Sequence, residues 1–387
     1  MKKSIFALCA LACVSPLFAD TVEMVADGSV LTGLQNSAND FIIKLPDGAT
    51  SGSATIDGRV VANTLVIRSG VTFTSVTASW ITAGSSGNSL INNGLTIESG
   101  ATFNSGRDFG EFTGSSTYTS GGMRVGSGTS KISGNLVVNG YRYNPANNMW
   151  HGDNYAFAAG GTQFNVYAGA TITQKGVSHK DASSTMRAIN KITAKEFTIH
   201  NGVAKNALMF DEFVFLKDTA LNMSSSNTIV SGAAYGATSQ ANSTFYATGA
   251  VVVASYNGAQ NEFGAIKAVE NSELKFISDA SSKLDVSLVD IITADLADST
   301  GKINLKLNFA DESLRIANLR DLLDNDRIDS IQIYLDVDGK KQYVDAIEGV
   351  NFKILDNGWL TTAIPEPATY AAIFGAVALA FAIRRRK

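Results

Sequence analysis

The fold is decided by a nine-residue stretch, Leu65–Phe73 (LVIRSGVTF), which returns 30 residues later as Leu95–Phe103 (LTIESGATF). In both copies, apolar and polar residues alternate before the glycine and alternate again after it. Alternation with a period of two is typical of short strands that bury one face. The glycine between them suits a turn, because glycine adopts positive φ without steric cost. Each copy is therefore predicted to form two strands joined at a corner.

A shorter form of this pattern, an apolar residue followed by two variable residues and glycine, recurs along the chain. Its copies begin at Ile67, Ile97, Val137, Val166, Ile199 and Ile229, so they lie 30, 40, 29, 33 and 30 residues apart. Leu45–Gly48 is a candidate for an earlier copy. Repeats with a period of 20–50 residues indicate a solenoid, in which each repeat buries its apolar face against its neighbours.

We therefore predict a mainly β protein in which residues 20–263 form a right-handed parallel β-helix or β-solenoid. The segments between the copies are rich in Ser, Thr, Asn and Gly, as in residues 82–88. Such uncharged side chains stack on the outside of a solenoid without the repulsion that stacked like charges suffer. An ordinary β-sandwich with glycine turns is the alternative fold.

The sequence changes character in its last quarter. Residues 285–356 contain 15 Asp/Glu and 8 Lys/Arg, so 23 of 72 residues are charged, against 17% in the whole chain. The expected elements are a strand at 303–309, a helix at 313–323 and a hairpin over 331–346 that turns at Asp338-Gly339. We predict that residues 264–360 form a smaller α+β or β-rich section that caps the solenoid.

The N-terminus has the three parts of a secretory signal peptide. The basic residues Lys2 and Lys3 precede an apolar run from Ile5 to Val14, and Ser15–Ala19 follows it. This run is too short to span a bilayer, which takes about 20 apolar residues. We predict a signal peptide at residues 1–19, export by the Sec machinery, and cleavage by signal peptidase between Ala19 and Asp20. A buried first helix is the alternative.

Once the predicted signal peptide is removed, the composition of the remaining chain excludes several classes of protein function. Both cysteines, Cys9 and Cys13, lie inside the signal peptide, so the mature chain has none. That excludes disulfides, thiolate metal sites and a cysteine nucleophile, although lipidation at Cys13 is the alternative reading. The net charge of −4 argues against a nucleic-acid-binding protein. Between residues 20 and 364 it becomes −9, because the two ends hold six basic residues and one acidic residue.

The C-terminus also has three parts. Pro-Glu-Pro leads into an apolar run at 371–383, and the chain ends on four cations. The prolines keep the residues before them extended, which suits the active site of a processing enzyme. The apolar run is short for a membrane span, and terminal cations hold such an end in the cytoplasm. The predicted sorting residues are Pro365, Glu366, Pro367, Arg384, Arg385 and Arg386.

This order of parts closely resembles the PEP-CTERM sorting signal of Gram-negative bacteria. The resemblance covers residues 365–387, and we assign 361–387 to the signal and its hydrophobic helix. It implies an exosortase-type enzyme that cleaves near Pro-Glu-Pro. It also implies a precursor anchored in the inner membrane by a transient transmembrane helix, then release to the outer surface or the extracellular matrix. A plain tail anchor is the alternative. The repeat resembles the β-helical passengers of autotransporter-type surface proteins.

Motifs for chemistry are few. The mature chain has no Gly-x-Ser-x-Gly elbow, and its histidines are not spaced for zinc. Clustered oxygens at 324–329 and 336–339 could bind calcium, but an EF-hand loop starting at 324 fails the pattern, and both clusters fit a helix end and a hairpin turn better. We therefore expect no catalytic residues, no metal and no cofactor. The histidines are His151, His179 and His200, and the carboxylates that an acid–base mechanism would draw on are Asp57, Asp108, Glu111 and Asp153.

One segment, residues 141–155, concentrates aromatic side chains in a region of small residues. Aromatic faces next to Asn and Asp suit a sugar, which offers C–H groups on one face and hydroxyls around its rim. The alternative is that these aromatics cover an exposed repeat. The candidate glycan-binding residues are Tyr141, Tyr143, Trp150 and Tyr155.

Together these features predict an exported, surface-sorted, non-enzymatic protein with a structural or adhesive role in the envelope or the extracellular polysaccharide matrix. Its expected partners are the export and processing enzymes and extracellular polysaccharide, without nucleic acid. The alternative is a β-helical polysaccharide-degrading enzyme or a glycan-binding protein.

Overall fold

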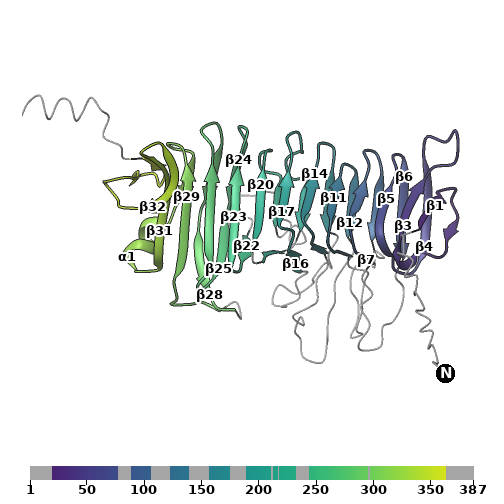
Figure 1. Ribbon diagram of the computed structural model, residues 1–387, viewed down its shortest axis with the longest axis horizontal. Coiled ribbons are helices and arrows are strands. Elements are labelled where there is room, and N and C mark those ends of the chain that lie inside the picture. Colours follow the sequence, from purple (N-terminus) through teal and green to yellow (C-terminus); the bar gives the residue numbers. More distant parts are fainter. Residues whose placement is uncertain are drawn as a thin grey trace, which may run out of the picture.

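The computed structural model describes residues 20–76, 89–105, 123–138, 157–174, 189–210, 212–216, 218–231, 244–294 and 297–362. In this part of the chain there are 34 strands and one helix of six residues, α1 (Leu319–Asp324). The prediction of a mainly β protein is confirmed. The strands stand side by side along the long axis, from β1 at the N-terminal end to β31 and β32 at the other end (Figure 1).

The strands form three parallel ladders, and each full repeat contributes one strand to each ladder. The first ladder holds β1 (Thr21–Val25), β3 (Gln35–Lys44), β5 (Val61–Ile67), β8 (Leu95–Ile97), β11 (Thr129–Ile132), β14 (Gln163–Val166), β17 (Glu196–Ile199), β20 (Thr219–Met223), β23 (Ala250–Ser255), β26 (Glu273–Ser278), β29 (Ile303–Phe309) and β31 (Ile328–Val337).

The second ladder runs beside the first in the same 21-stranded sheet, and it starts from the early residues of β3 and β5. It continues with β7 (Ser89–Ile91), β10 (Met123–Val125), β13 (Phe157–Ala159), β16 (Ile189–Ile192), β19 (Glu212–Phe215), β22 (Thr244–Ala247), β25 (Ala265–Val269) and β28 (Val289–Ile292).

The third ladder is an eight-stranded sheet. Its strands are β2 (Val30–Leu31), β4 (Gly52–Asp57), β6 (Val71–Val76), β9 (Thr102–Ser105), β12 (Asn135–Val138), β15 (Thr171–Gln174), β18 (Leu208–Phe210) and β21 (Ile229–Ser231). Three later strands, β24 (Gln260–Phe263), β27 (Lys283–Val286) and β30 (Leu314–Ile316), form a separate parallel sheet.

The core is a set of columns in which each inward side chain packs on the same position of the next repeat. The two copies that decide the fold align as predicted, with Ile67 opposite Ile97 and Phe73 opposite Phe103. The two phenylalanine rings stack with centroids 5.3 Å apart, and all four side chains are fully buried. Burying side chains of this size contributes roughly 1.5–3 kcal/mol each.

The predicted register is wrong in two repeats. The residue that follows Ile97 in the ladder is Ile132, and the residue that follows Ile199 is Met223. The predicted copies at Val137 and Ile229 lie in the third ladder, in β12 and β21. The glycine pattern gave the wrong register in these repeats for two reasons. Only one residue separates Ile132 from the glycine that follows it, where the other copies have two, and serines follow Met223 where the other copies have glycine. Similarly, Ile43 and not Leu45 pairs with Ile67.

The C-terminal section continues the same ladders. β23 pairs with β26 and β26 pairs with β29, so the first ladder passes residue 263 without a break. The strand expected at 303–309 and the hairpin of β31 with β32 (Lys340–Asp345) are confirmed. Asp338 and Gly339 both have positive φ, 53° and 77°, as a type I′ turn requires. The domain boundary at 263 stays a prediction.

The helix expected at 313–323 is wrong in its first half. Leu314 and Ile316 form strand β30 and pair in parallel with Leu284 and Val286. Residues 314, 316, 319 and 322 are all apolar, a spacing that fits a strand followed by a helix as well as one longer helix. Pairing with the buried strand β27 favours the strand at 314–316, because tertiary packing overrides a local sequence pattern.

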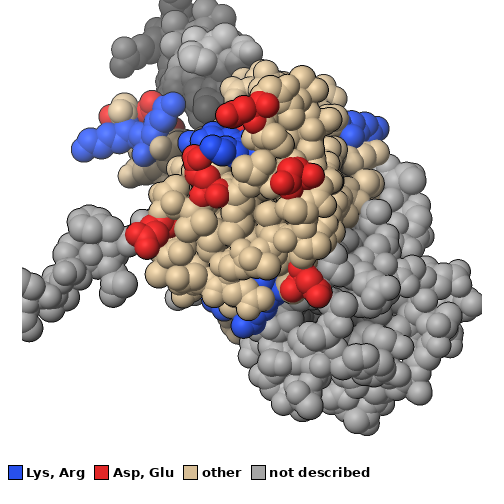
Figure 2. Space-filling model, turned by 90° about the vertical axis from the view of Figure 1, so that its right-hand side faces the viewer, with Lys and Arg blue, Asp and Glu red and all other residues tan. Residues whose placement is uncertain are grey.

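The two ends of the stack differ. At the N-terminal end, β1 pairs on one side only among the described strands, with β3. Figure 2 looks onto this end and shows a mostly uncharged surface with a few acidic and basic side chains, some of them in contact. At the other end, α1, β32 and the pair β33 (Lys353–Ile354) and β34 (Leu360–Thr361) follow the last rungs. In the described part of the chain, the C-terminal end is thus the more covered of the two. This difference matters because open strand edges invite further pairing.

Candidate functional site

One edge of the stack is where the chain leaves the described repeats and returns to them. Five segments, 77–88, 106–122, 139–156, 175–188 and 232–243, each start after a strand of the third ladder and end before a strand of the second. The strands before them are β6, β9, β12, β15 and β21, and those after them are β7, β10, β13, β16 and β22. Because neighbouring strands in each ladder are parallel, their carboxyl ends lie at the same edge. We call this the insertion edge.

The predicted glycan-binding residues belong to one of these segments. Tyr141, Tyr143, Trp150 and Tyr155 lie outside the described residues, between β12 and β13. The structure therefore places the two ends of their segment on the insertion edge. Their binding role stays a prediction.

The predicted acid–base and metal candidates give no assembled site in the described part. Asp57 ends β4 and is exposed, whereas Asp108, Glu111 and Asp153 lie outside the described residues, as do His151 and His179. Within the described ranges, no group of three or more His, Cys, Asp or Glu side chains is arranged to hold a metal ion. Asp326 of the first oxygen cluster pairs with Lys302 at 2.7 Å.

His200, the one described histidine, belongs to a stacked column of turn residues. Its ring lies parallel to that of Tyr167 one repeat earlier, with centroids 4.3 Å apart. Its Nε2 is 3.0 Å from Oδ1 of Asn165, also one repeat earlier. Burial lowers the pKa of His200 below its ordinary value of 6.5. A neutral, stacked imidazole suits inter-repeat packing more than proton transfer.

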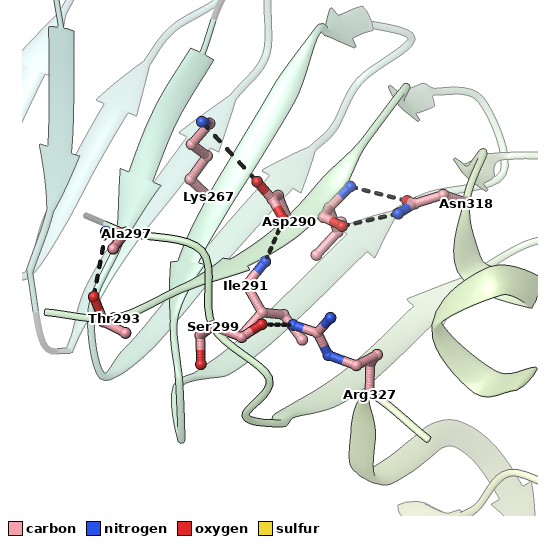
Figure 3. A network of polar contacts seen from close by, with 9 residues as sticks. Lys267, Asp290, Ile291, Thr293, Ala297, Ser299, Asn318 and Arg327 are labelled. Carbon is pink, nitrogen blue, oxygen red and sulfur yellow. Dashed lines mark hydrogen bonds and ion pairs between the residues drawn. The ribbon is translucent and has the colours of Figure 1, made fainter. Parts of the chain in front are cut away.

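A network of polar contacts ties the last rungs of the stack together (Figure 3). The side-chain amide of Asn318 donates to the carbonyl of Val289 at 2.8 Å and accepts from its N–H at 2.9 Å, as a neighbouring strand would. Arg327 donates to the carbonyls of Ser299 at 2.5 Å and Gly301 at 3.0 Å. These bonds satisfy backbone groups that would otherwise have no ladder partner.

The last described residues are fastened to this end by a second set of contacts, which we call the C-terminal lock. Oδ1 of Asp311 accepts hydrogen bonds from the N–H of Thr362 at 2.7 Å and from its hydroxyl at 2.9 Å. Nε of Arg315 donates to the carbonyl of Asn357 at 3.0 Å, and its Nη1 binds both oxygens of Asp285.

The electrostatics of the C-terminal lock favour a charged carboxylate. Burial alone would raise the pKa of Asp311, but hydrogen bonds from Thr362 and Thr361 outweigh it and hold the pKa below its usual value. Asp311 stands two residues before the helix that the sequence predicts at 313–323, a position that indicates no partner near the end of the chain. Its partner lies 51 residues further along the chain, so no local signal could have revealed the lock.

Beyond Thr362, residues 363–387 match the family model described as the PEP-CTERM protein-sorting motif. The chain carries an exosortase sorting motif. This motif implies an exported protein with a membrane-anchored precursor, Sec-dependent export and processing by an exosortase. No curated protein and no solved structure matches the chain.

The predicted processing residues lie almost wholly outside the described part. Pro365, Glu366, Pro367, Arg384, Arg385 and Arg386 fall inside the motif match, and their individual roles stay predictions. Asp20 is the first described residue and is exposed, whereas Ala19 lies outside. In the described ranges, no helix is long and apolar enough to cross a membrane, and the predicted apolar helix at 371–383 is not among them.

Proposed function

We propose that the body is a right-handed parallel β-helix of the kind found in autotransporter-type passengers. Its three parallel ladders support this, since each repeat returns to pair in parallel with the repeat before it. Crossover connections between parallel strands of one sheet are right-handed in about 98% of cases. The same handedness throughout would let every repeat stack on the last without a break.

We further propose that this protein is a non-enzymatic structural or adhesive protein of the outer surface or the extracellular matrix. The observation that carries the proposal is the insertion edge, along which five segments start and end in line. Ser, Thr, Asn and Gly make up at least half of three of these segments, 77–88, 106–122 and 232–243. A stack that carries five segments of 12 to 18 residues along one edge can hold several contacts at once, and linked weak contacts raise avidity strongly.

The test compares the intact chain with a variant that lacks residues 363–387, both expressed in the native host. We expect an external protease to remove the body of the intact chain from whole cells, while the truncated chain stays inside or is secreted without attachment. Retention of the intact chain in the inner membrane with an uncleaved tail would contradict surface sorting.

Glycan binding is the second candidate, because the aromatic segment 139–156 joins β12 to β13, with further segments in the repeats before and after it. Retention of the body on an extracellular polysaccharide column should be lost in Trp150→Ala. It should be kept in Trp359→Phe, which changes a tryptophan at the far C-terminal end. Release of shorter sugars by the wild-type body would instead favour a polysaccharide-degrading enzyme.

A further inference from the structure

The C-terminal lock fixes where the sorting motif leaves the body. Thr362 is held by Asp311, and Thr361 before it pairs with Lys353 of β33. Only two residues separate Thr362 from Pro365. Since an extended chain advances at most about 3.6 Å per residue, Pro365 lies within about 11 Å of the lock. An enzyme that acts at Pro-Glu-Pro must therefore come against this end of the stack.

An apolar tip lies beside this exit point. It consists of Ile347 and Val350, which are 54% and 61% exposed in a part of the surface where most neighbours are polar or charged. The loop that carries them is closed by Asn351, whose Oδ1 accepts from the N–H of Ile347 at 2.8 Å. Its Nδ2 donates to the carbonyl of Asp345 at 2.9 Å. With Gly349 at a φ of 77°, the loop presents both apolar side chains in a fixed arrangement.

The strand pairings place the apolar tip next to the lock. The N–H of Gly349 donates to the carbonyl of Phe352 at 2.8 Å, which closes the loop directly before β33. Since Lys353 pairs with Thr361 in antiparallel register, Phe352 comes opposite Thr362. Glu348 also binds Arg320 of α1, which ties the loop to the helix.

The charges around the tip distinguish a protein partner from a lipid surface. Residues 319–362 contain nine Asp/Glu and five Lys/Arg. An anionic membrane surface attracts basic segments and repels an acidic one. Fixed, exposed apolar side chains within a polar rim are instead typical of protein interfaces.

We propose that the apolar tip, Ile347 with Val350, docks on the membrane-bound enzyme that processes the sorting motif and so positions Pro-Glu-Pro for cleavage. This inference rests on the proposed sorting function. The tip and the exit point face the same partner, because the two residues between Thr362 and Pro365 leave no room for a separate spacer. The body would thus take part in its own processing, in addition to the motif itself.

The first test is the double variant Ile347→Thr/Val350→Thr in the full-length chain in its native host. Threonine keeps the branched shape but places a hydroxyl in the contact. The control is Val30→Thr, which makes the same change at an equally exposed valine, 62% exposed, at the opposite end of the stack. The rate of C-terminal processing, measured by pulse-chase, should fall by about tenfold in the double variant and stay unchanged in the control.

A photo-crosslinking residue at position 347 identifies what the tip touches. An adduct with the processing enzyme is expected, and an adduct with lipid would overturn the proposal in favour of a membrane contact. Processing of the double variant at the wild-type rate, with both chains equally folded, would also overturn it. If the wild-type chain itself were never processed, the sorting function would fail first, so the two failures are distinguishable.

Discussion

Replacing Tyr343 with phenylalanine is expected to stabilise the C-terminal end of the stack. Tyr343 lies on β32, with its ring 5.2 Å from Nζ of Lys275 and 5.0 Å from the ring of Tyr334. Its hydroxyl oxygen is buried and makes no hydrogen bond to any residue that the structure describes. Phenylalanine keeps the ring and its contacts and removes only this oxygen, so the packing of the end is preserved.

The magnitude follows from the unpaired hydroxyl. A buried polar group without a hydrogen bond costs about 1–3 kcal/mol. We expect the low end, about 1 kcal/mol, because the ring as a whole is only half-buried. In a chain of this size, such a gain raises the melting temperature by about 2 °C.

The gain should grow at alkaline pH. Burial raises the pKa of Tyr343 to about 12, from an ordinary value of 10. Above pH 10 the unfolded chain therefore loses this proton while the folded chain keeps it, so folded wild-type protein loses stability as pH rises. Two pKa units correspond to about 2.7 kcal/mol, which solvent screening at a half-exposed ring reduces to about 1 kcal/mol. This full effect is reached only near pH 12, and about 0.3 kcal/mol of it is expressed at pH 10.5.

The assay is amide exchange of β31 and β32 together with urea unfolding of the mature chain, at pH 7 and pH 10.5. Exchange is needed because the ends of a repeat stack can open before its middle. Tyr334→Phe is the matched control, since it removes the same atom from the adjacent ring and should give no gain. A loss of stability in Tyr343→Phe, or an equal effect in both variants, would refute the argument from an unpaired hydroxyl.

Three further outcomes test other parts of the stack. Gly128→Ala should lower the free energy of unfolding by about 3 kcal/mol or more, because φ is 89° and a Cβ would lie 2.0 Å from a backbone oxygen. Gly28→Ala is the control, since φ is 91° but the space around it is open, and it should lower the same quantity by only about 1 kcal/mol in the urea titration. Because the pKa of Asp311 is lowered in the folded chain, its stabilising effect is present above the unfolded pKa, near 3.8, and is lost as pH falls through the folded pKa. Protection of the Thr362 amide from hydrogen exchange should fall over that pH range in the wild type. In Asp311→Ala it should be low at all pH values. The lowered pKa of His200 means that the unfolded chain binds its proton first below about pH 6.5, so the urea midpoint should drop between pH 7.5 and 5.5, and drop less in His200→Gln.

The sequence predicted the ladder where apolar alternation and glycine agree. In Leu65–Phe73 and Leu95–Phe103 both signals give one register, and the structure confirms it. The two signals disagree at Met223, which is buried in the ladder although serines follow it where the other copies have glycine. There Ser225 donates to the carbonyl of His200 at 2.9 Å and accepts from the N–H of Val203 at 3.1 Å. Ser225 thus bonds the backbone of the preceding turn, while the positive φ of its own turn, 50°, falls on Asn227, so a search for glycine misses this repeat.

The candidate site was harder to predict, because its parts meet only through the stack. The two halves of the C-terminal lock are far apart in sequence, and the place of the apolar tip beside the lock depends on the pairing of β33 with β34. By contrast, the sorting motif consists of consecutive residues and was recognisable from the order of its three parts along the sequence. Contiguous signals survive in a sequence, whereas sites made by pairing require the register first.

The unequal repeat lengths, which obscured the periodicity of the sequence, indicate which part of the molecule can change in length. The ladder positions Ile67, Ile97, Ile132, Val166, Ile199 and Met223 are 30, 35, 34, 33 and 24 residues apart. The shortest spacing belongs to the repeat that passes from β18 to β19 across a single residue, and the longer ones contain segments at the insertion edge. The entropy of closing a loop grows only slowly with its length. Segments at this edge can therefore change in length and composition while the inward columns keep their register.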